Sequence, residues 1–396
     1  MFAMPWGGSE ELWAAAADTA LEQGHEVDLF LYRWLIEPPA ARHLREKGAR
    51  VHLRARHDAN VARLAFLHAT ILTADWRSHA ALSTFRVIER RAPDIVCISQ
   101  GDVYSGAREN SRLVQWLKRS STPYVVLCQY TNDHERVQPV IRERARNFFA
   151  GAVQVVFVAE ANRRAAERQL GLPLEDAVVL PNPVNLHDRS TVPWPATDNG
   201  KVQLANVAKL AVYAKGQDVL LETLASQRWR ERNWQLNLYG EGLDFEHLRT
   251  LRDHYGLRER VAFRGFAPDI RSVWADNHAL VMPSRAEGIP LSVVEAMLCG
   301  RPVLATDVGG HREWLTDGET GWIAKAPTPW ALDEALERAW NHRPRWADMG
   351  ARAHEVASER ADPAAGRRLL NVLMHCARRS RGPRPAPHAS PRPIQD

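Results

Sequence analysis

The fold is decided by the stretch Ser284-Arg285-Ala286-Glu287-Gly288-Ile289-Pro290-Leu291-Ser292-Val293-Val294-Glu295-Ala296-Met297. The apolar residues just before it, 278–283, are typical of the end of a buried strand. Pro290 suits the first turn of a helix. Proline has no backbone N–H, and an N–H at that position would have no partner within the helix. Gly300 and Pro302 then predict the end of this helix. Glu287 is therefore expected in a strand-to-helix loop and Glu295 inside the helix.

The two glutamates indicate a ligand that carries both phosphate and hydroxyl groups. Free N–H groups at a helix N-terminus attract phosphate. A carboxylate beside them repels phosphate, so its natural partners are hydroxyl groups. A ligand with a phosphate at the helix start and two sets of hydroxyl groups, one on each carboxylate, fits a sugar nucleotide. In the alternative interpretation Glu287 is a solvated loop residue and Glu295 a surface helix residue. Against it, Glu295 stands among apolar residues at 293–297, where an unpartnered charge is costly.

A family resemblance rests on these residues. Glu287-x7-Glu295, preceded by Pro283-Ser284 and followed by Gly288, resembles the E-x7-E motif of retaining glycosyltransferase family 4. The continuation is similar to the same family at 301–310, which reads RPVLATDVGG, and at 317–321, which reads DGETG. The resemblance implies an α/β protein with the GT-B fold, in which two doubly wound Rossmann-like domains face each other across a deep interdomain cleft.

Size and composition agree with two globular domains and exclude several other classes. The 396 residues are 45% hydrophobic and 25% charged, with a net charge of +5. No nucleic-acid-binding motif accompanies the charge, so we expect no nucleic-acid partner. The four cysteines have no metal or redox spacing, and no apolar stretch reaches the roughly 20 residues of a membrane helix. With no signal peptide in view, we expect a cytoplasmic protein, with peripheral contact to the anionic inner face of the membrane as a candidate interaction.

The N-terminal residues predict a strand–glycine–helix unit. Residues 1–5 are all that remains for a first strand, and Trp6-Gly7-Gly8-Ser9 opens a helix to about Gln23, with Ser9 as its N-cap. By position, Gly7 and Gly8 resemble the family's loop near the donor diphosphate, although a simple tight turn explains them equally well. The short first strand departs from the family pattern. Either the start codon lies upstream or the domain tolerates a stunted strand.

Polar residues follow two apolar runs, 94–99 and 123–128, that predict buried strands. Continuous apolar strands between helices indicate a parallel sheet covered on both faces, whose ligands bind beyond the carboxyl ends of the strands. The acceptor-side candidates are Gln100, Asp102, Asn132, Asp133 and His134. The resemblance implies that a His or Asp near the second strand end approaches the donor sugar, and which residue serves is open. N-capping of the next helix by Asn132 or Asp133 is the alternative.

The domain limits follow from one turn and one polar segment. Residues 181–185, PNPVN, are similar to the family's turn that closes the first domain, and the next residues are rich in Pro, Asp, Ser and Thr. We expect an acceptor-side domain at 1–185, a linker at 186–200, a donor-binding domain at 201–362, a helix at 363–379 that crosses back to the first domain, and a disordered, basic, Pro-rich tail at 380–396.

A second motif supplies positive charge. Lys209-Leu210-Ala211-Val212-Tyr213-Ala214-Lys215-Gly216 resembles the family's Arg-Leu…Lys-Gly motif, in which two cations clamp the diphosphate. Two exposed loop lysines are the alternative, but the chain has only six lysines in all. Lys209 replaces the usual arginine, which keeps the charge and loses the bidentate fork. The turn Gly240-Glu241-Gly242 indicates close backbone approach, and the family places the nucleobase near the loop after Gly265.

The resemblance implies a retaining transferase that moves a hexose from a nucleoside diphosphate sugar to a glycan, lipid-linked or small-molecule acceptor, with no cofactor and no metal ion. The implied catalytic residues are Lys215, Lys209 and Glu287. The implied donor-binding residues are Gly7, Gly8, Gly240, Glu241, Gly265, Gly288, Ile289, Pro290, Leu291 and Glu295. A non-catalytic sugar-nucleotide-binding protein, a sugar-nucleotide epimerase and a phosphorylase are the alternatives. The donor base, the sugar, the acceptor and the oligomeric state stay open.

Overall fold

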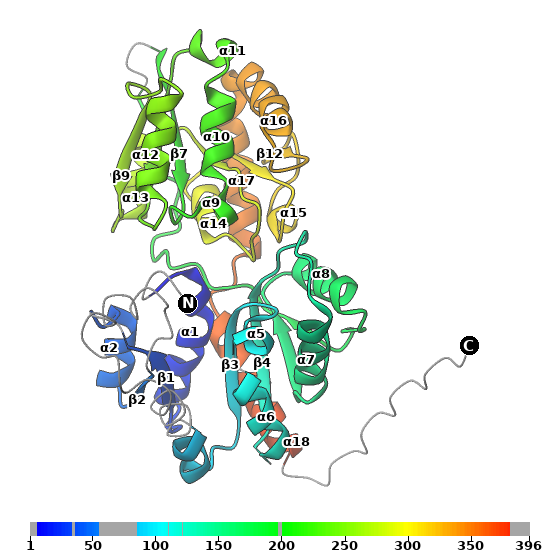
Figure 1. The fold of residues 1–396 in the computed structure, drawn as a ribbon. Coiled ribbons are helices and arrows are strands. Elements are labelled where there is room, and N and C mark those ends of the chain that lie inside the picture. Colours follow the sequence, from blue (N-terminus) through cyan, green and yellow to red (C-terminus); the bar gives the residue numbers. More distant parts are fainter. Residues whose placement is uncertain are drawn as a thin grey trace, which may run out of the picture.

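The computed structural model describes residues 6–33, 36–54, 85–109, 111–120, 122–196 and 200–380. These residues form two lobes, one above the other in Figure 1, with the chain colours running from blue to teal below and from green to orange above. The expected first strand at 1–5 lies outside the described residues, as does the tail from 381 onward.

The N-terminal lobe is built from parallel strands with helices packed on them. Its strands are β1 (Asp28–Tyr32), β2 (Arg50–Arg54), β3 (Val96–Asp102), β4 (Tyr124–Tyr130), β5 (Gln154–Phe157) and β6 (Val178–Val179). Its helices are α1 (Gly8–Glu22), α2 (Pro39–Glu46), α5 (Ser105–Glu109), α6 (Ser111–Arg119), α7 (Pro139–Ala150) and α8 (Glu160–Leu170), and residues 85–91 are also helical. In the described part, β1 pairs with β2, and β3 to β6 follow one another in a second sheet. Every pairing is parallel, as expected from the apolar runs.

The C-terminal lobe is a doubly wound sheet with the order β12-β11-β10-β7-β8-β9, all parallel. The strands are β7 (Val202–Val207), β8 (Trp234–Tyr239), β9 (Val261–Gly265), β10 (Ala279–Met282), β11 (Val303–Thr306) and β12 (Gly321–Ala324). The helices are α9 (Val212–Lys215), α10 (Gln217–Leu224), α11 (Gln227–Arg230), α12 (Phe245–His254), α13 (Ile270–Asp276), α14 (Leu291–Leu298), α15 (His311–Trp314), α16 (Pro329–Asn341) and α17 (Trp346–Arg360), with a short 3₁₀ helix at Arg343–Arg345. The last helix of the chain is α18 (Ala365–Ser380). Strand order reverses between β7 and β10, and ligands of such sheets bind at that switch point.

Two expectations about helix starts are wrong by a residue or two. Helix α1 begins at Gly8 with Gly7 as its N-cap, and Ser9 lies inside the helix, where its hydroxyl donates to Glu10. Pro290 is the N-cap of α14 rather than part of its first turn. In both cases the chain enters the helix from an extended backbone without a side-chain cap. The backbone N–H groups of both helix starts are therefore not bonded to a capping side chain.

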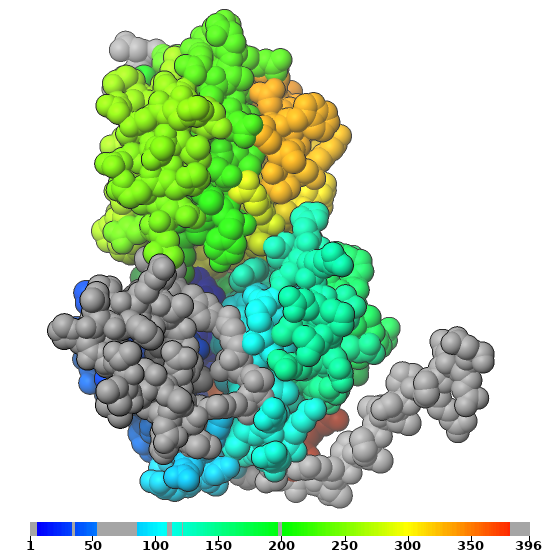
Figure 2. All heavy atoms as spheres, viewed as in Figure 1, coloured from blue at the N-terminus to red at the C-terminus, as the bar shows by residue number. Residues whose placement is uncertain are grey.

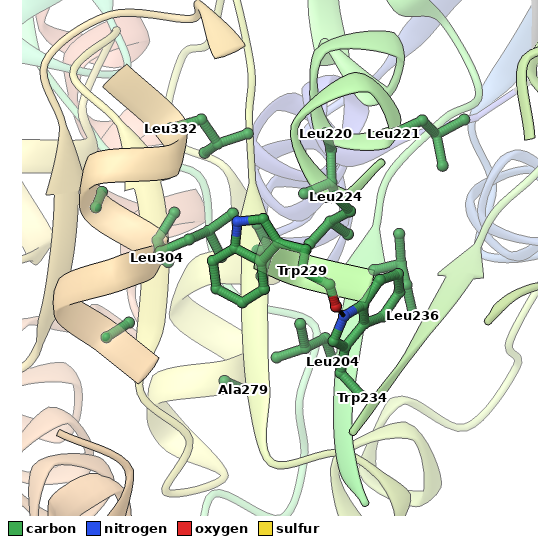
Figure 3. Close-up of a cluster of buried hydrophobic side chains, with 14 of the residues drawn as sticks. Leu204, Leu220, Leu221, Leu224, Trp229, Trp234, Leu236, Ala279, Leu304 and Leu332 are labelled. Atoms are coloured by element: carbon green, nitrogen blue, oxygen red, sulfur yellow. Dashed lines mark hydrogen bonds between the residues drawn. The ribbon is translucent and has the colours of Figure 1, made fainter. Parts of the chain in front are cut away.

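Tryptophans fill much of the C-terminal core. Trp229, Trp234 and Trp274 are fully buried. The indole N–H of Trp234 donates to the carbonyl of Trp229 at 2.7 Å, and Figure 3 shows the two rings among leucines from α10, β7, β8, β11 and α16. A buried indole N–H needs such a partner. The core therefore fixes the strand ends that carry the loops described below.

The last helix returns to the N-terminal lobe, where α18 packs on α1 (Figure 1). Leu369 and Leu370 share one core with Leu12 and Ala16. The packing is close, because a Cβ added at Gly366 would lie 2.5 Å from the Cβ of Ala15. The two lobes are thus joined by two chain crossings, one before β7 and one between α17 and α18.

Candidate functional site

A cavity of about 1380 Å³ opens between the lobes. Residues of both lobes line it, among them Glu10, Gln100, Asp102, Tyr130 and Asn132 below and Lys209, Tyr213, Gly242, Leu243 and Ala286 above. In the space-filling view of Figure 2 the two lobes form separate masses that meet at this level. The described residues therefore include the interdomain cleft that the GT-B fold requires.

Lys215 and Glu287, 72 positions apart in the chain, form an ion pair next to Ala286, a residue of the cavity lining. The Lys215 ammonium donates to Oε1 of Glu287 at 2.8 Å, and the hydroxyl of Ser284 donates to the same oxygen at 2.7 Å. Glu287 is 5% exposed and Ser284 is fully buried. The carboxylate is therefore fixed by one cation and one hydroxyl, and its other oxygen has no partner among the described residues.

A glycine makes this pairing possible. Gly216 follows α9 with φ +64°, and a Cβ there would lie 2.0 Å from the carbonyl oxygen of Pro283. Any other residue would hold the two loops apart and would strain the backbone. The Lys-Gly sequence thus brings the Lys215 loop against the Glu287 loop.

Arg285, which the sequence analysis did not single out, also connects the Lys215 loop to the Glu287 loop. Its guanidinium donates to both carboxylate oxygens of Asp218 in α10, at 2.7 and 2.8 Å, and also to the carbonyl of Val212. Its backbone N–H donates to the carbonyl of Ala214 at 2.7 Å. A bidentate arginine–carboxylate pair is strong and directional. Arg285 therefore holds α9, which carries Lys215, beside the loop that carries Glu287.

The Glu287 loop also rests on the N-terminal lobe. The side-chain amide of buried Asn162 donates to the carbonyl of Glu287 at 2.9 Å, and Thr131 pairs with Glu287 in an isolated antiparallel bridge. Gly288 is needed here, since a Cβ would lie 1.9 Å from the carbonyl of Gln129. Close by, the carboxylate of Glu313 accepts hydrogen bonds from the first two N–H groups of α8. The loop therefore forms part of the contact between the lobes.

Two helix N-termini meet beside these residues. The start of α1 lies against the C-terminal lobe, because a Cβ at Gly7 would lie 3.1 Å from the Lys209 ammonium and a Cβ at Gly8 would lie 3.0 Å from Leu291. Leu291 is the first residue of α14. The structure thus brings together Gly7, Gly8, Lys209 and Leu291, which the sequence places in three separate segments. Two helix dipoles and a lysine make this a favourable position for an anion.

The ionisation of Lys209 depends on its surroundings. Burial lowers its pKa, the carboxylate of Glu10 opposes that shift, and Lys215 adds to it. Burial also raises the pKa of Glu10, against the hydrogen bond from Ser9 and the charge of Lys209. Glu10 is 5% exposed and was missed by the sequence analysis. The signal for it was a carboxylate in the first turn of the helix that follows the glycine pair.

Glu295 lies on α14 and is partly buried, with a carboxylate from the other lobe near it. Burial, and to a smaller extent the charge of Glu11, raises the pKa of Glu295 to about 7. Burial also raises the pKa of Glu11, whose carboxylate accepts a hydrogen bond from the Trp6 indole at 2.9 Å. Two partly buried carboxylates that influence each other's charge are suited to a ligand that supplies hydroxyl donors.

The glycine turn after β8 supports the Lys209 loop. The backbone N–H of Leu210 donates to the carbonyl of Glu241 at 3.0 Å, and a Cβ at Gly240 would lie 2.0 Å from the carbonyl of Ala208. Gly265 accepts from the N–H of Gly240 at 2.7 Å. Ile289 is buried in the core under the sheet. These residues shape the wall of the cleft through their backbones, and the side chain of Glu241 is exposed.

On the lower wall, Gln100 and Asp102 already bind their own neighbours. The amide of Gln100 donates to Val103 and Cys128, and its oxygen accepts from the N–H of Gly106. Asp102 accepts from the N–H of Tyr104 at 2.7 Å and from the hydroxyl of Ser105 at 2.9 Å, and pairs with Arg108. Both line the cavity, while these bonds use much of their hydrogen-bonding capacity.

The turn after β4 holds the other three acceptor-side candidates. The side-chain oxygen of Asn132 accepts from the N–H of His134 at 3.1 Å, and His134 is exposed. Helix α7 starts later, at Pro139 with Gln138 as its N-cap, so N-capping by Asn132 or Asp133 is wrong. Burial raises the pKa of Asp133, against the charges of Arg168 and His134, and one of its oxygens is buried with no partner among the described residues.

Within the described ranges, no three His, Cys, Asp or Glu side chains are grouped so that they could hold a metal ion. Over the same ranges, no helix combines the length and the apolar character needed to cross a membrane.

Comparisons with known proteins agree with this geometry. Residues 201–342 match the model of the family described as glycosyl transferases group 1. The chain is 31% identical to the lipopolysaccharide core biosynthesis mannosyltransferase LpsB of Rhizobium meliloti, over 57% of this chain and 72% of that protein. It is 32% identical to the putative glycosyltransferase EpsD of Bacillus subtilis, over 33% of this chain and 34% of EpsD. Two other curated relatives are matched over only 52% and 21% of their length.

Among solved structures, the chain is similar to Anabaena HepE in complex with UDP and glucose, with a TM-score of 0.69 at 19% identity over 94% of this chain and 97% of that chain. At this identity the likeness bears on the fold alone, and it agrees with two Rossmann-like lobes around a cleft. With the LpsB match and the family model, these findings show that the chain belongs to the group 1 glycosyl transferases and has the GT-B fold.

Proposed function

We propose that this chain is a retaining glycosyltransferase of family 4 that moves a hexose from a nucleoside diphosphate sugar to an acceptor hydroxyl in the cleft. The observation that carries the proposal is the meeting of Lys215, Glu287 and Lys209 with the starts of α1 and α14. The two lysines and the helix starts suit a diphosphate, and the carboxylate of Glu287 suits sugar hydroxyls. HepE, a structure of the same fold, was solved with UDP and glucose.

The chemistry follows from where charge develops. Cleaving the anomeric C–O bond puts negative charge on the leaving diphosphate and positive charge on the sugar, and fixed cations near the leaving group stabilise that transition state. Lys215 and Lys209 supply the cations, assisted by the N–H groups of the two helix starts. The two lysines take the part that a metal ion plays in other transferases, and the proposal therefore includes metal independence.

The sugar and the ribose are assigned to the two glutamates. Glu287, with the backbone at Gly288 and Ile289, accepts hydrogen bonds from hexose hydroxyls, and Glu295 accepts them from ribose hydroxyls. The pairing of Glu287 with Lys215 at 2.8 Å supports this division, because it sets the sugar-binding carboxylate beside the diphosphate-binding cation. We assign the donor to residues 201–362 and the acceptor to residues 1–185.

The acceptor faces the turn after β4. Gln100 and Asp102 are bonded to their own neighbours, so Asn132, Asp133 and His134 are the better candidates. Tyr213 and Leu243, 70% and 84% exposed, line the opposite wall. An exposed aromatic ring beside an apolar side chain suits the ring of a glycan acceptor. We place the protein in the cytoplasm, with peripheral contact to an anionic membrane surface through its excess of arginine.

A donor panel tests the proposal. UDP-, GDP- and ADP-sugars are added to the purified full chain, and the melting temperature and the release of nucleoside diphosphate are measured. A ligand at 100 times its Kd stabilises the folded state by about 2.7 kcal/mol. The proposal predicts one preferred base and acceptor-dependent release with the anomeric configuration retained. EDTA is predicted to leave the rate unchanged.

The alternatives give different results in the same assay. Stabilisation by a sugar nucleotide without release, across a set of glycan, lipid-linked and small-molecule acceptors, would indicate a binding protein. Conversion of the sugar without an acceptor would indicate an epimerase. Failure of every sugar nucleotide to stabilise the chain would contradict donor binding altogether.

A further inference from the structure

A chain of hydrogen bonds runs from α15 to the carboxylate of Glu287. Nδ1 of His311 lies 2.6 Å from the carbonyl oxygen of Thr306, and the hydroxyl of Thr306 donates to the carbonyl of Ser284 at 2.6 Å. The hydroxyl of Ser284 then donates to Oε1 of Glu287 at 2.7 Å. The same oxygen accepts from Lys215. The chain thus ends on the ion pair at the wall of the cleft.

Every member of this chain is buried. His311, Thr306 and Ser284 are each 0% exposed. Buried hydrogen bonds in series are fixed in geometry and depend on one another. Thr306 lies at the end of β11 and Ser284 just after β10, two strands that pair directly, so the sheet itself sets their spacing.

The ring of His311 is held in one tautomer. Since a carbonyl oxygen can only accept, Nδ1 must carry the proton. Nε2 is buried and has no hydrogen-bond partner among the described residues. A proton there would be a buried donor without an acceptor, and the charged ring would face Lys215 as well as Glu287 and Asp307. Burial lowers the pKa of His311, in agreement with a neutral ring.

We propose that His311 is a positioning residue that acts through Thr306 and Ser284 to hold the Glu287 carboxylate in place for the donor sugar. The inference rests on the proposed function, because it assumes that Glu287 accepts hydrogen bonds from sugar hydroxyls. His311 itself does not touch the sugar. It fixes the backbone at the end of β11, where the hydroxyl of Thr306 bonds to the carbonyl of Ser284. Because its ring is neutral, it also places no second positive charge near Lys215.

The geometry predicts which substitutions preserve the chain. The amide nitrogen of asparagine reaches the position of Nδ1, whereas that of glutamine reaches the position of Nε2. His311→Asn therefore keeps the donor to Thr306 and His311→Gln loses it. Thr306→Val removes the middle link with little change in volume. His278 offers a matched control, since it is 4% exposed and its Nε2 has no partner among the described residues. Its Nδ1 accepts from the N–H of Gln203, so it takes no part in the series of hydrogen bonds that ends on Glu287.

The test compares two ligands on each variant. UDP-glucose, GDP-mannose and ADP-glucose are measured by calorimetry against UDP, GDP and ADP, and the pair that binds the wild type is used. Loss of one charge-assisted hydrogen bond corresponds to about tenfold in affinity. We predict about tenfold weaker binding of the sugar nucleotide to His311→Gln and Thr306→Val, unchanged binding of the nucleoside diphosphate, and near-normal binding of both to His311→Asn and His278→Gln.

Three outcomes would overturn the inference: equal effects of His311→Gln and His311→Asn, equal loss of both ligands, or the same selective loss in His278→Gln. A second readout does not depend on activity or on donor identity. Imidazole ¹⁵N spectra of the wild type must show His311 neutral with its proton on Nδ1, and a proton on Nε2 would also overturn it. Failure of the wild type to bind any of the six nucleotides would instead contradict the proposed function.

Discussion

The two walls of the cleft use their polar groups differently. On the C-terminal side, the side chains of Lys215 and Ser284 both donate to Oε1 of Glu287, and the other carboxylate oxygen has no partner among the described residues. On the N-terminal wall, Gln100 and Asp102 bond to the turns that carry them. Under the proposed assignment, the groups that hold the donor are fixed by bonds to one another, whereas the polar groups on the acceptor side mainly stabilise local structure.

The largest effect is expected from Lys215. If Lys215 binds the diphosphate as proposed, Lys215→Ala removes a cation whose contact is strongest in the transition state, and we predict a fall in turnover of roughly 100-fold or more, within the ~10²–10³ range for one such donor. Turnover is measured at saturating donor. Lys325, an exposed lysine directly after β12 in the same lobe, gives the control Lys325→Ala. Near-normal turnover in Lys215→Ala would contradict the account of this wall.

Arg285 tests whether the wall works as a unit. Arg285→Lys keeps the charge and loses the bidentate grip on Asp218. Displacing Lys215 and Glu287 is expected to lower kcat/KM on the order of 30-fold, since small misplacements are costly in catalysis. Arg338→Lys is the control, because one guanidinium nitrogen of Arg338, on α16, donates to both carboxylate oxygens of Asp317. If the Arg285→Lys and Asp218→Asn effects simply add in the double variant, the two residues are not a unit.

The pKa of Glu295 predicts that donor affinity depends on pH. With a pKa of about 7, its ionised fraction rises about tenfold between pH 6 and pH 8. Because only the carboxylate accepts two hydrogen bonds from ribose, donor affinity is predicted to rise by about that factor, and to be flat in Glu295→Gln. Glu11→Gln removes the neighbouring charge and should move the midpoint to lower pH. An unchanged profile in Glu295→Gln would assign the pH dependence to another group.

The same pKa predicts the sign of a stability effect. Folding raises the pKa of Glu295 above its ordinary 4.5, so the protonated form is favoured in the folded state. That stabilisation is present below pH 4.5 and is lost as pH rises toward 7. Glu295→Gln should therefore raise the free energy of unfolding by about 1 kcal/mol at pH 8, a value reduced for partial exposure, and not at pH 4.5.

The smallest effect on turnover is expected on the opposite wall. Asp102→Asn weakens the bonds from Tyr104 and Ser105 and should lower the free energy of unfolding by about 1 kcal/mol with turnover unchanged. Asp362→Asn is the matched control, because Asp362 accepts from the N–H of Ala364 just before α18. A selective rise of the acceptor KM in Asp102→Asn would give this carboxylate a direct role in binding.

The sequence predicted the regular parts of the fold well. The apolar runs 94–99 and 123–128 were confirmed as parts of strands β3 and β4, and the parallel sheet was confirmed. Such elements have local signals, namely apolar runs and glycine or proline at their ends. Helix α17 was not predicted separately, because its buried face consists largely of small residues such as Ala353 and Ala357. A face of alanines gives a weak hydrophobic period.

The site could be predicted where it depends on local motifs. The family resemblance singled out Lys215 and Glu287, which the structure brings into an ion pair, but it did not single out the residues that hold them. The partner of Arg285 is Asp218, 67 positions away, and the partner of Asn162 is Glu287, 125 positions away. His311 bonds to Thr306, 5 positions away at the end of the preceding strand. Nothing local marks a buried arginine, amide or imidazole as a support for a loop. These contacts are set by the packing of strand ends, which sequence periodicity does not describe.

The central claim is that a nucleoside diphosphate sugar lies between the walls, with its diphosphate on the lysines and its sugar on Glu287. It is tested most directly by a crystal structure of the full chain with the sugar nucleotide that gives the largest thermal stabilisation. The account predicts diphosphate oxygens within hydrogen-bond distance of the ammonium groups of Lys215 and Lys209, and a sugar hydroxyl on the Glu287 carboxylate. A nucleotide bound with its diphosphate away from both lysines would contradict it.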